Sequence, residues 1–387
     1  MSGGQQNDRQ KLEDSLQLIN YNMETSWNKS HFLHLDKPLL LGLLLLSSIG
    51  LVVLYSAGAQ DIELIFRQML RILGGFGIML VVAQIRTQHI VRWVPWLYIC
   101  GVLLLLLVLV VGELTNGSQR WLNLGLFRFQ PSEIMKLAVP MMVTWYFAAR
   151  PLPPRSWCLL LASLIIAIPV ILVAKQPDLG TALLIASSGL FVLLLSGLSW
   201  RIVFGFITAS AAFAPVLWFY IMHDYQRERV LTFLNPEAKP LDAGYHIIQS
   251  KIAIGSGGME GKGWLNGTQS LLQFLPERTT DFIFAVYSEE FGLLGILVLL
   301  SLYFFIISRG MYIALQAQDT FSRLLVGSLV LTFFVYIFVN MGMVIGILPV
   351  VGLPLPLISY GGTSIITLMA GFGLIMGVHT HRRFLSS

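Results

Sequence analysis

Long apolar stretches separated by short polar connectors dominate the pattern of side chains along this chain. A helix needs about 20 apolar residues to cross the hydrocarbon core of a bilayer, so runs of that length bounded by charge, Pro or Gly predict membrane spans. Ten such runs occur, at residues 38–57, 68–85, 93–112, 133–149, 157–174, 181–198, 202–222, 282–308, 324–344 and 363–378. The pattern therefore predicts an all-α integral membrane protein with about ten transmembrane helices.

Composition supports this prediction. Hydrophobic residues make up 56% and charged residues 12% of the 387 positions, and the mean hydropathy is +0.74. Soluble domains run at roughly 45–50% apolar and about 25% charged, so a bilayer has to be the solvent for this chain. The net charge of +5 is small and much of it lies at helix ends, which argues against a nucleic-acid partner. Cys100 and Cys158 lie in different apolar runs, and we expect both to be buried packing residues without a disulfide.

Basic side chains set the orientation, because Lys and Arg in short loops stay on the cytoplasmic side. If the ten spans alternate, one side collects Lys37, Arg86, Arg92, Arg150, Arg155, Arg201, Arg309, Arg323, Arg382 and Arg383. Both termini are then cytoplasmic. The prediction divides the chain into a cytoplasmic tail at 1–37, a transmembrane domain at 38–378 and a second cytoplasmic tail at 379–387.

The connector at residues 223–281, between the seventh and eighth spans, is the longest in the chain and lies on the opposite, outer face. A connector of that length is more often functional than a passive link. Within it, residues 245–254 are predicted to form a short amphipathic helix at the interface.

Charged residues at the membrane boundary are costly unless they face a cavity or a partner, which makes them candidates for a site. Pro131 suits a helix start, and Glu133 and Lys136 then form an i,i+3 pair just inside that helix. The pair is either a satisfied intramembrane ion pair or part of an anion site. Arg120 and Arg128, near the same helix N-terminus, favour the anion site because they would attract phosphate groups.

Two aspartates mark further candidate positions. Asp178 lies in a tight turn before the sixth span, where it serves either as a helix cap or as a site residue. Asp281 lies where the long connector re-enters the membrane, and there a carboxylate can act as a general base or hold a divalent cation. A helix cap is the plainer alternative for Asp281 too. Glu289 and Glu290 lie deeper in the same span, and at least one of them requires a partner or a cavity.

Several motifs in these clusters, taken in order, resemble those of the SEDS family of bacterial membrane proteins (shape, elongation, division and sporulation), in particular its rod-shape-determining branch. The resemblance covers nearly the whole chain from the first span onward. Its most specific stretches are residues 119–122, 128–133, 176–181, 243–250, 280–282 and 353–362.

This resemblance implies a peptidoglycan glycosyltransferase of the bacterial inner membrane that polymerises lipid II, with ten helices and a large periplasmic loop between the seventh and eighth. It places Asp281 at the family's essential aspartate and the pair Glu133–Lys136 in the central cavity. Asp178 and Arg229 match further polar positions that line the site.

The chemistry of such a reaction fits these residue types. Asp281 is expected to accept the hydroxyl proton of the incoming lipid II. A divalent cation, Mg²⁺ or Mn²⁺, with Asp281 as its one candidate ligand, and the basic groups of Lys136, Arg120 and Arg229 are expected to neutralise the leaving undecaprenyl pyrophosphate. The implied partners are the growing glycan strand, a class B penicillin-binding protein transpeptidase and other proteins of the elongation complex.

Two other functions remain open at this point. A flippase for the lipid-linked precursor would also have a charged cavity among many helices, but it needs a site near the midplane that is reachable from both sides. A scaffold for cell-wall assembly would tolerate substitution of Asp281. The crowding of polar motifs on the outer face favours the enzyme.

Overall fold

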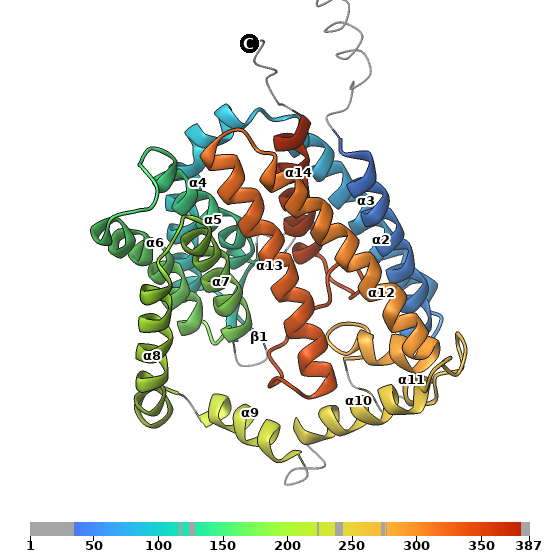
Figure 1. Cartoon of the computed structure of the whole chain (residues 1–387). Coiled ribbons are helices and arrows are strands. Elements are labelled where there is room, and N and C mark those ends of the chain that lie inside the picture. The colour runs from blue at the N-terminus through green and yellow to red at the C-terminus, as the bar shows by residue number, and fades with distance from the viewer. Residues whose placement is uncertain are drawn as a thin grey trace, which may run out of the picture.

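The computed structural model describes residues 35–115, 118–123, 128–222, 224–236, 243–271, 275 and 277–380. Most of the predicted tails, 1–34 and 381–387, thus lie outside the described residues. Helices occupy all ten ranges that the sequence predicted as spans (Figure 1). They are α2 (Lys37–Ala57), α3 (Ile62–Gln84), α4 (Thr87–Val111), α5 (Pro131–Ala148), α6 (Ser156–Lys175), α7 (Leu179–Leu195), α8 (Trp200–Val216), α12 (Ile283–Leu315), α13 (Thr320–Ile345) and α14 (Thr363–Thr380).

Among the described residues, seven of these helices are long and apolar enough to cross a membrane: α2, α3, α4, α6, α12, α13 and α14. Helix α7 is apolar but has 17 residues, and α8 continues into the π-helix η1 (Leu217–Ile221). The protein is therefore a mostly helical, multi-pass membrane protein.

Helix α13 lies at the centre of the bundle (Figure 1). In its most apolar window 78% of the residues are buried, against 22% in the corresponding windows of α3, α6 and α12. Helices α5, α7 and α12 pack around α13. A lipid-facing helix keeps one side free of protein contacts, whereas most of the surface of α13 is covered by other helices. Side chains of α13 can therefore contact several helices at once.

The long connector contains three helices, α9 (Asp224–Leu234), α10 (Ala243–Gly257) and α11 (Thr268–Leu271), which run along one end of the bundle (Figure 1). Residues 245–254 lie within α10, so the prediction of a helix there is confirmed. In α10, Ser250 donates a hydrogen bond to Val344 O at 2.8 Å, which ties this helix to the end of α13.

The connector between α4 and α5 is not helical and contains short strands, which the predicted all-α fold class did not include. It contains β1 (Glu113–Thr115), β2 (Ser118–Asn123) and β3 (Arg128–Phe129), which form an antiparallel sheet in the order β1-β2-β3. Strands of two to six residues are too short to produce a detectable alternation of polar and apolar positions. Their stability comes from pairing, as between Leu122 and Phe129.

Helix α12 is broken at Gly292, whose φ of 60° is not helical. A break in a transmembrane helix leaves backbone groups that must find other partners. Residues 258–263, which follow α10, supply them through four hydrogen bonds: Leu293 N to Gly258 O (3.0 Å), Leu294 N to Met259 O (3.1 Å), Lys262 N to Glu289 O (3.0 Å) and Gly263 N to Glu290 O (2.9 Å).

The end of the bundle opposite α9 and α10 is held by Asp36, which precedes α2. Its Oδ1 accepts from Leu39 N at 2.9 Å, and Arg309 of α12 donates to both carboxylate oxygens, at 3.0 and 2.7 Å. His379 Nδ1 of α14 lies 3.1 Å from Asp36 Oδ2. Burial raises the pKa of Asp36, but the hydrogen bonds from His379 and Arg309 outweigh it and hold this pKa well below its usual range. One carboxylate therefore joins three helices.

The expectation that both cysteines are buried is wrong for Cys100, which is exposed on α4, while Cys158 is partly buried. The outer surface of a membrane protein faces acyl chains, so an apolar run is no sign that a residue within it is covered by protein.

Candidate active site

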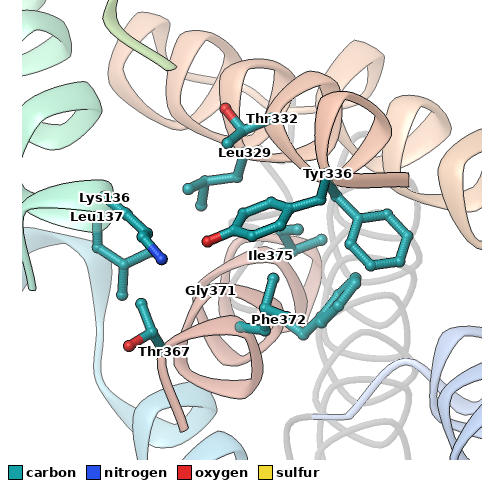
Figure 2. Close-up of a pocket in the computed structure, with 11 residues that line it drawn as sticks. Lys136, Leu137, Leu329, Thr332, Tyr336, Thr367, Gly371, Phe372 and Ile375 are labelled. Atoms are coloured by element: carbon teal, nitrogen blue, oxygen red, sulfur yellow. The ribbon is translucent and has the colours of Figure 1, made fainter. Parts of the chain in front are cut away.

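The pair Glu133–Lys136 lies in the first turns of α5, which begins at Pro131 as the sequence predicted. Lys136 Nζ is 2.6 Å from Glu133 Oε1, and the two side chains are only 6% and 7% exposed. Across the interface with α13, Lys136 Nζ lies 5.2 Å from the ring centroid of Tyr336, and the ammonium and hydroxyl groups point toward each other (Figure 2). The predicted spacing thus produces a buried ion pair with an aromatic neighbour.

A cavity of about 40 Å³ adjoins Lys136 between α5, α13 and α14, and its polar lining comes from Lys136, Thr332, Tyr336 and Thr367 (Figure 2). This volume is enough for a few water molecules. Glu133 Oε2 is buried and has no hydrogen-bond partner among the described residues. Because burying an ion pair costs about as much desolvation energy as the pairing returns, stability alone does not explain these charges.

Asp178 occupies the N-cap position of α7, where its Oδ1 accepts from Thr181 N at 3.3 Å. The capping interpretation is therefore confirmed, and it is not the whole role of this side chain. Gln130 Nε2 donates to Asp178 Oδ2 at 3.1 Å, and Arg120 of β2 lies 3.7 Å from Oδ1. Arg120 also donates to Pro177 O, which fixes β2 against this turn.

Asp281 lies in the turn that precedes α12 and is partly exposed. The N-cap position of α12 belongs to Phe282, so the capping alternative for Asp281 is not what the structure shows. The main-chain oxygen of Asp281 accepts from Asn340 Nδ2 of α13 at 3.0 Å. Its carboxylate lies beside Gly352: a Cβ atom added to that glycine would be 3.4 Å from Asp281 Oδ2.

Residues 351–353, in the connector between α13 and α14, lie between the two aspartate turns. A Cβ atom on Gly180, two residues after Asp178, would be 2.9 Å from Val351 O, so the first turn of α7 touches this segment directly. Its next residue, Gly352, touches Asp281. Segment 351–353 therefore adjoins both the turn of Asp178 and the turn of Asp281.

Helix α13 contacts both the ion pair Glu133–Lys136 and the turn of Asp281. Tyr336 and Asn340 are four residues apart and so lie on one face of the helix. Tyr336 contacts Lys136 and Asn340 contacts Asp281. The structure thus brings Glu133, Lys136, Arg120, Asp178 and Asp281 into one neighbourhood around α13 and segment 351–353.

An apolar cavity of about 400 Å³ opens beside this neighbourhood. Its walls come from α6 and α7, from Met222 directly after η1, from Val230 of α9 and from residues 349–351. The predicted site residue Arg229 is the neighbour of Val230 on α9, and its side chain, like that of Arg128, lies outside the described residues.

Sequence reasoning missed Tyr336 and Asn340. A signal for Asn340 existed, because a lone amide within an apolar run has to find partners in the membrane. No signal marked Tyr336, since tyrosine is common at both boundaries of a transmembrane helix.

The described residues contain no group of three or more His, Cys, Asp and Glu side chains close enough to hold a metal ion. Mg²⁺, however, is usually bound through one or two carboxylates together with the phosphates of a substrate. A partly exposed carboxylate such as Asp281 fits that second kind of site, in which the substrate supplies the remaining ligands.

Comparison with known proteins shows the family to which this chain belongs. The family model described as a cell cycle protein and named for FtsW, RodA and SpoVE matches residues 30–384. The chain belongs to this family. It is the one that the motifs in the sequence resembled, so that prediction is confirmed.

Within the family, the chain is 56% identical over 367 residues to the peptidoglycan glycosyltransferase MrdB of Escherichia coli K12. The aligned region covers 95% of this chain and 98% of that protein. It is similar in structure to a chain of a peptidoglycan synthase complex that coordinates polymerization and crosslinking, with a TM-score of 0.78, 33% identity and coverage of 89% and 97%. It is also similar to the rod shape determining protein RodA of Thermus thermophilus, with a TM-score of 0.69, 30% identity and coverage of 90% and 98%.

Proposed function

We propose that this chain is a peptidoglycan glycosyltransferase of the bacterial inner membrane that polymerises lipid II into glycan strands during cell elongation. The observation that supports this function is that one face of α13 contacts both candidate groups: Tyr336 lies beside the buried Lys136, and Asn340 binds the main chain of the partly exposed Asp281. The identity with MrdB supports the reaction class.

We assign ten spans to the bundle, made by α2 to α8 and α12 to α14. Both termini are then cytoplasmic, with tails at 1–37 and 379–387 around a transmembrane domain at 38–378. The connector at 223–281, which holds α9 to α11, is periplasmic. This assignment rests on two observations: the basic residues of the short connectors fall on one side when the spans alternate, and all ten predicted ranges are helical.

In the reaction, a sugar hydroxyl of the incoming lipid II attacks the anomeric carbon of the growing strand, and undecaprenyl pyrophosphate leaves. Asp281 takes the proton of the attacking hydroxyl as general base, which is the role for which a side chain needs both partial exposure and a fixed backbone. Such a base typically contributes a rate factor of about 10²–10⁴.

Lys136, Arg120 and Arg229 are the basic groups we assign to the pyrophosphate. Lys136 is already paired with Glu133, so its charge is oriented rather than free to move. The Nε of Arg120 is buried and has no hydrogen-bond partner among the described residues, which leaves a donor for an anionic oxygen. Asp178 and Glu133 hold these two cations in place.

A divalent cation, Mg²⁺ or Mn²⁺, would supply additional charge neutralisation at the pyrophosphate, with Asp281 as the candidate protein ligand. We also propose that the chain works with a class B penicillin-binding protein transpeptidase and other proteins of the elongation complex. The similarity to a chain of a peptidoglycan synthase complex supports a crosslinking partner.

The test is polymerisation of purified lipid II by the wild type and by Asp281→Asn, with a purified class B penicillin-binding protein present. We expect Asp281→Asn to lower the rate by about 10²–10⁴. The matched control is Asp61→Asn, because Asp61 is an exposed aspartate that caps α3 through Glu63 N and Leu64 N.

Equal product from Asp281→Asn and the wild type would contradict the catalytic role of Asp281, whereas no product from either protein would favour a scaffold. Transport of labelled lipid II across vesicle membranes without polymer would favour the flippase instead.

A further inference from the structure

The turn that carries Asp281 is fastened to the connector between α13 and α14. Ser359 donates its hydroxyl to Thr280 O at 2.6 Å, and Tyr360 N donates to Thr279 O at 2.8 Å. Ser359 Oγ also accepts from Leu355 N at 2.8 Å, so the connector is folded onto itself at the same point. These bonds hold residues 279 and 280 and leave the next peptide group, that of Asp281, to another partner.

That partner is Asn340. Its side chain is fully buried within α13, and its Nδ2 donates to two main-chain oxygens, Asp281 O at 3.0 Å and Leu353 O at 2.6 Å. A side-chain amide has two N–H hydrogens, so this nitrogen is used to its full capacity. The Oδ1 of Asn340 has no hydrogen-bond partner among the described residues. The contacts of this side chain thus lie on two backbone segments.

Both segments adjoin the Asp281 carboxylate. One of them is the main chain of Asp281 itself, which carries the carboxylate. The other contains Gly352, with a φ of 76°, directly before Leu353. A Cβ atom at position 352 would be 3.4 Å from Asp281 Oδ2, so any shift between the two segments changes the surroundings of the carboxylate.

We infer that Asn340 is a positioning residue for the reaction: by bridging Asp281 O and Leu353 O, it sets the separation between the Asp281 turn and Gly352 and so the direction of the Asp281 carboxylate. This inference rests on the proposed function of Asp281 as general base. Asn340 itself stays buried and acts through the main chain. A misplacement of about 1 Å at a reacting group can lower a rate about 100-fold, so the bridge matters even without contact to substrate.

The first test measures kcat and KM for lipid II in Asn340→Leu and Asn340→Ser. Leucine keeps the branching of asparagine at Cγ and removes both donors, whereas serine keeps one donor. We expect a fall in kcat of about 10–100-fold for Asn340→Leu, a smaller fall for Asn340→Ser, and an unchanged KM, because binding groups elsewhere are untouched.

The matched control is Ser328→Ala. Ser328 is also fully buried on α13, and its hydroxyl donates within the helix, to Leu325 O at 2.8 Å. A wild-type kcat in Asn340→Leu, or an equal fall in kcat in Ser328→Ala, would overturn the inference.

The second test reads the position of residue 281 without using activity. A thiol introduced by Asp281→Cys, with Cys100 and Cys158 replaced by alanine, is alkylated by a soluble reagent in the detergent-purified protein. We expect Asn340→Leu to change the alkylation rate at a pH below the thiol pKa by about tenfold, as a one-unit pKa shift would, and Ser328→Ala to leave the rate unchanged.

The two tests separate the inference from the proposed function. Full activity of Asp281→Asn would overturn the catalytic role of Asp281, and the thiol rate would still decide whether Asn340 positions residue 281. An unchanged thiol rate in Asn340→Leu overturns the positioning role whatever the activity. If Asn340→Leu does not yield folded protein, the same measurements on Asn340→Ser decide: a changed alkylation rate is expected, and an unchanged rate would contradict the inference.

Discussion

The Glu289 carboxylate lies 2.7 Å from the Lys262 ammonium and is fully buried, one helical turn before the break in α12. Thr268 Oγ1 and Gln269 N add hydrogen bonds to the same carboxylate, at 3.0 and 3.1 Å. The cluster joins residues 262–269 of the long connector to the second turn of α12. Lys262 is thus the partner that a glutamate at this depth in a membrane span was expected to require.

Removing the cation should destabilise this region. We expect Lys262→Met to lower the free energy of unfolding by about 1–3 kcal/mol, less than for a wholly buried pair because Lys262 is partly exposed. Thermal unfolding in detergent measures the change. The double variant Glu289→Gln, Lys262→Met should recover part of the loss, because it leaves no unpaired charge. A midpoint in Lys262→Met equal to that of the wild type would contradict this account.

The pair Glu133–Lys136 distinguishes a structural ion pair from a functional one. The double variant Glu133→Gln, Lys136→Met removes both charges together, so it should keep a thermal midpoint close to that of the wild type. The polymerisation rate should nevertheless fall about 100-fold or more, because the cation assigned to the pyrophosphate is lost. A folded double variant with full polymerisation activity would reduce the pair to a packing feature.

Asp36 offers a test of the opposite end of the bundle. Asp36→Asn keeps a side-chain acceptor for Leu39 N and removes the charge that Arg309 and His379 contact. We expect a loss of about 1–3 kcal/mol in unfolding free energy, since hydrogen bonds to charged groups contribute about that much. Asp61→Asn, an exposed cap, is the control and should change the midpoint little. A smaller effect at Asp36 than at Asp61 would contradict the proposed role.

The contribution of Asp36 also depends on pH. Its pKa in the folded protein is lowered, so the folded state binds fewer protons than the unfolded state as the solution becomes acidic. This stabilisation is complete above the pKa of the unfolded carboxyl, near 3.8, and is lost as the pH falls through the lower pKa of the folded state. Unfolding midpoints of the wild type should therefore fall toward those of Asp36→Asn in strong acid.

His246 of α10 should give a second pH dependence, nearer to neutrality. Burial against Phe282, whose ring lies 5.6 Å away, lowers the pKa of His246, with Glu277 opposing the shift. Because the folded state favours neutral His246, the contribution of this side chain to the stability of the fold is complete above about pH 6.5. That contribution is lost as the pH falls through the pKa of His246 in the folded state. His246→Phe keeps the stacking and removes the titration. Midpoints measured between about pH 5 and 8 should vary less in that variant than in the wild type.

Much of this fold could be predicted from the sequence because membrane helices are specified locally, by length and apolar composition. The helix start at Pro131 and the spacing of Glu133 and Lys136 are local features of the same kind. The partners of Asn340 could not be predicted, because Asp281 lies 59 residues before it and only the packing of α13 against α12 brings them together. The three short strands after α4 were missed because pairing, and not an intrinsic pattern, stabilises them.

The proximity of Asp178 to segment 351–353 was likewise beyond reach of the sequence. Gly180 permits the contact, because a Cβ atom there would be 2.9 Å from Val351 O, but a glycine in a sequence does not say what approaches it. The aspartates themselves were found because a carboxylate at a membrane boundary is costly without a reason for its presence.

The break at Gly292 divides α12 into two rods of different surroundings. The helical geometry is interrupted at Gly292, so the rod before it and the rod after it can differ in tilt. Segment 258–263 replaces the missing turn with backbone bonds to both rods, to Glu289 and Glu290 before the break and to Leu293 and Leu294 after it. A displacement of that segment would therefore be transmitted to the rod that follows Asp281 as well as to the rod beyond Gly292.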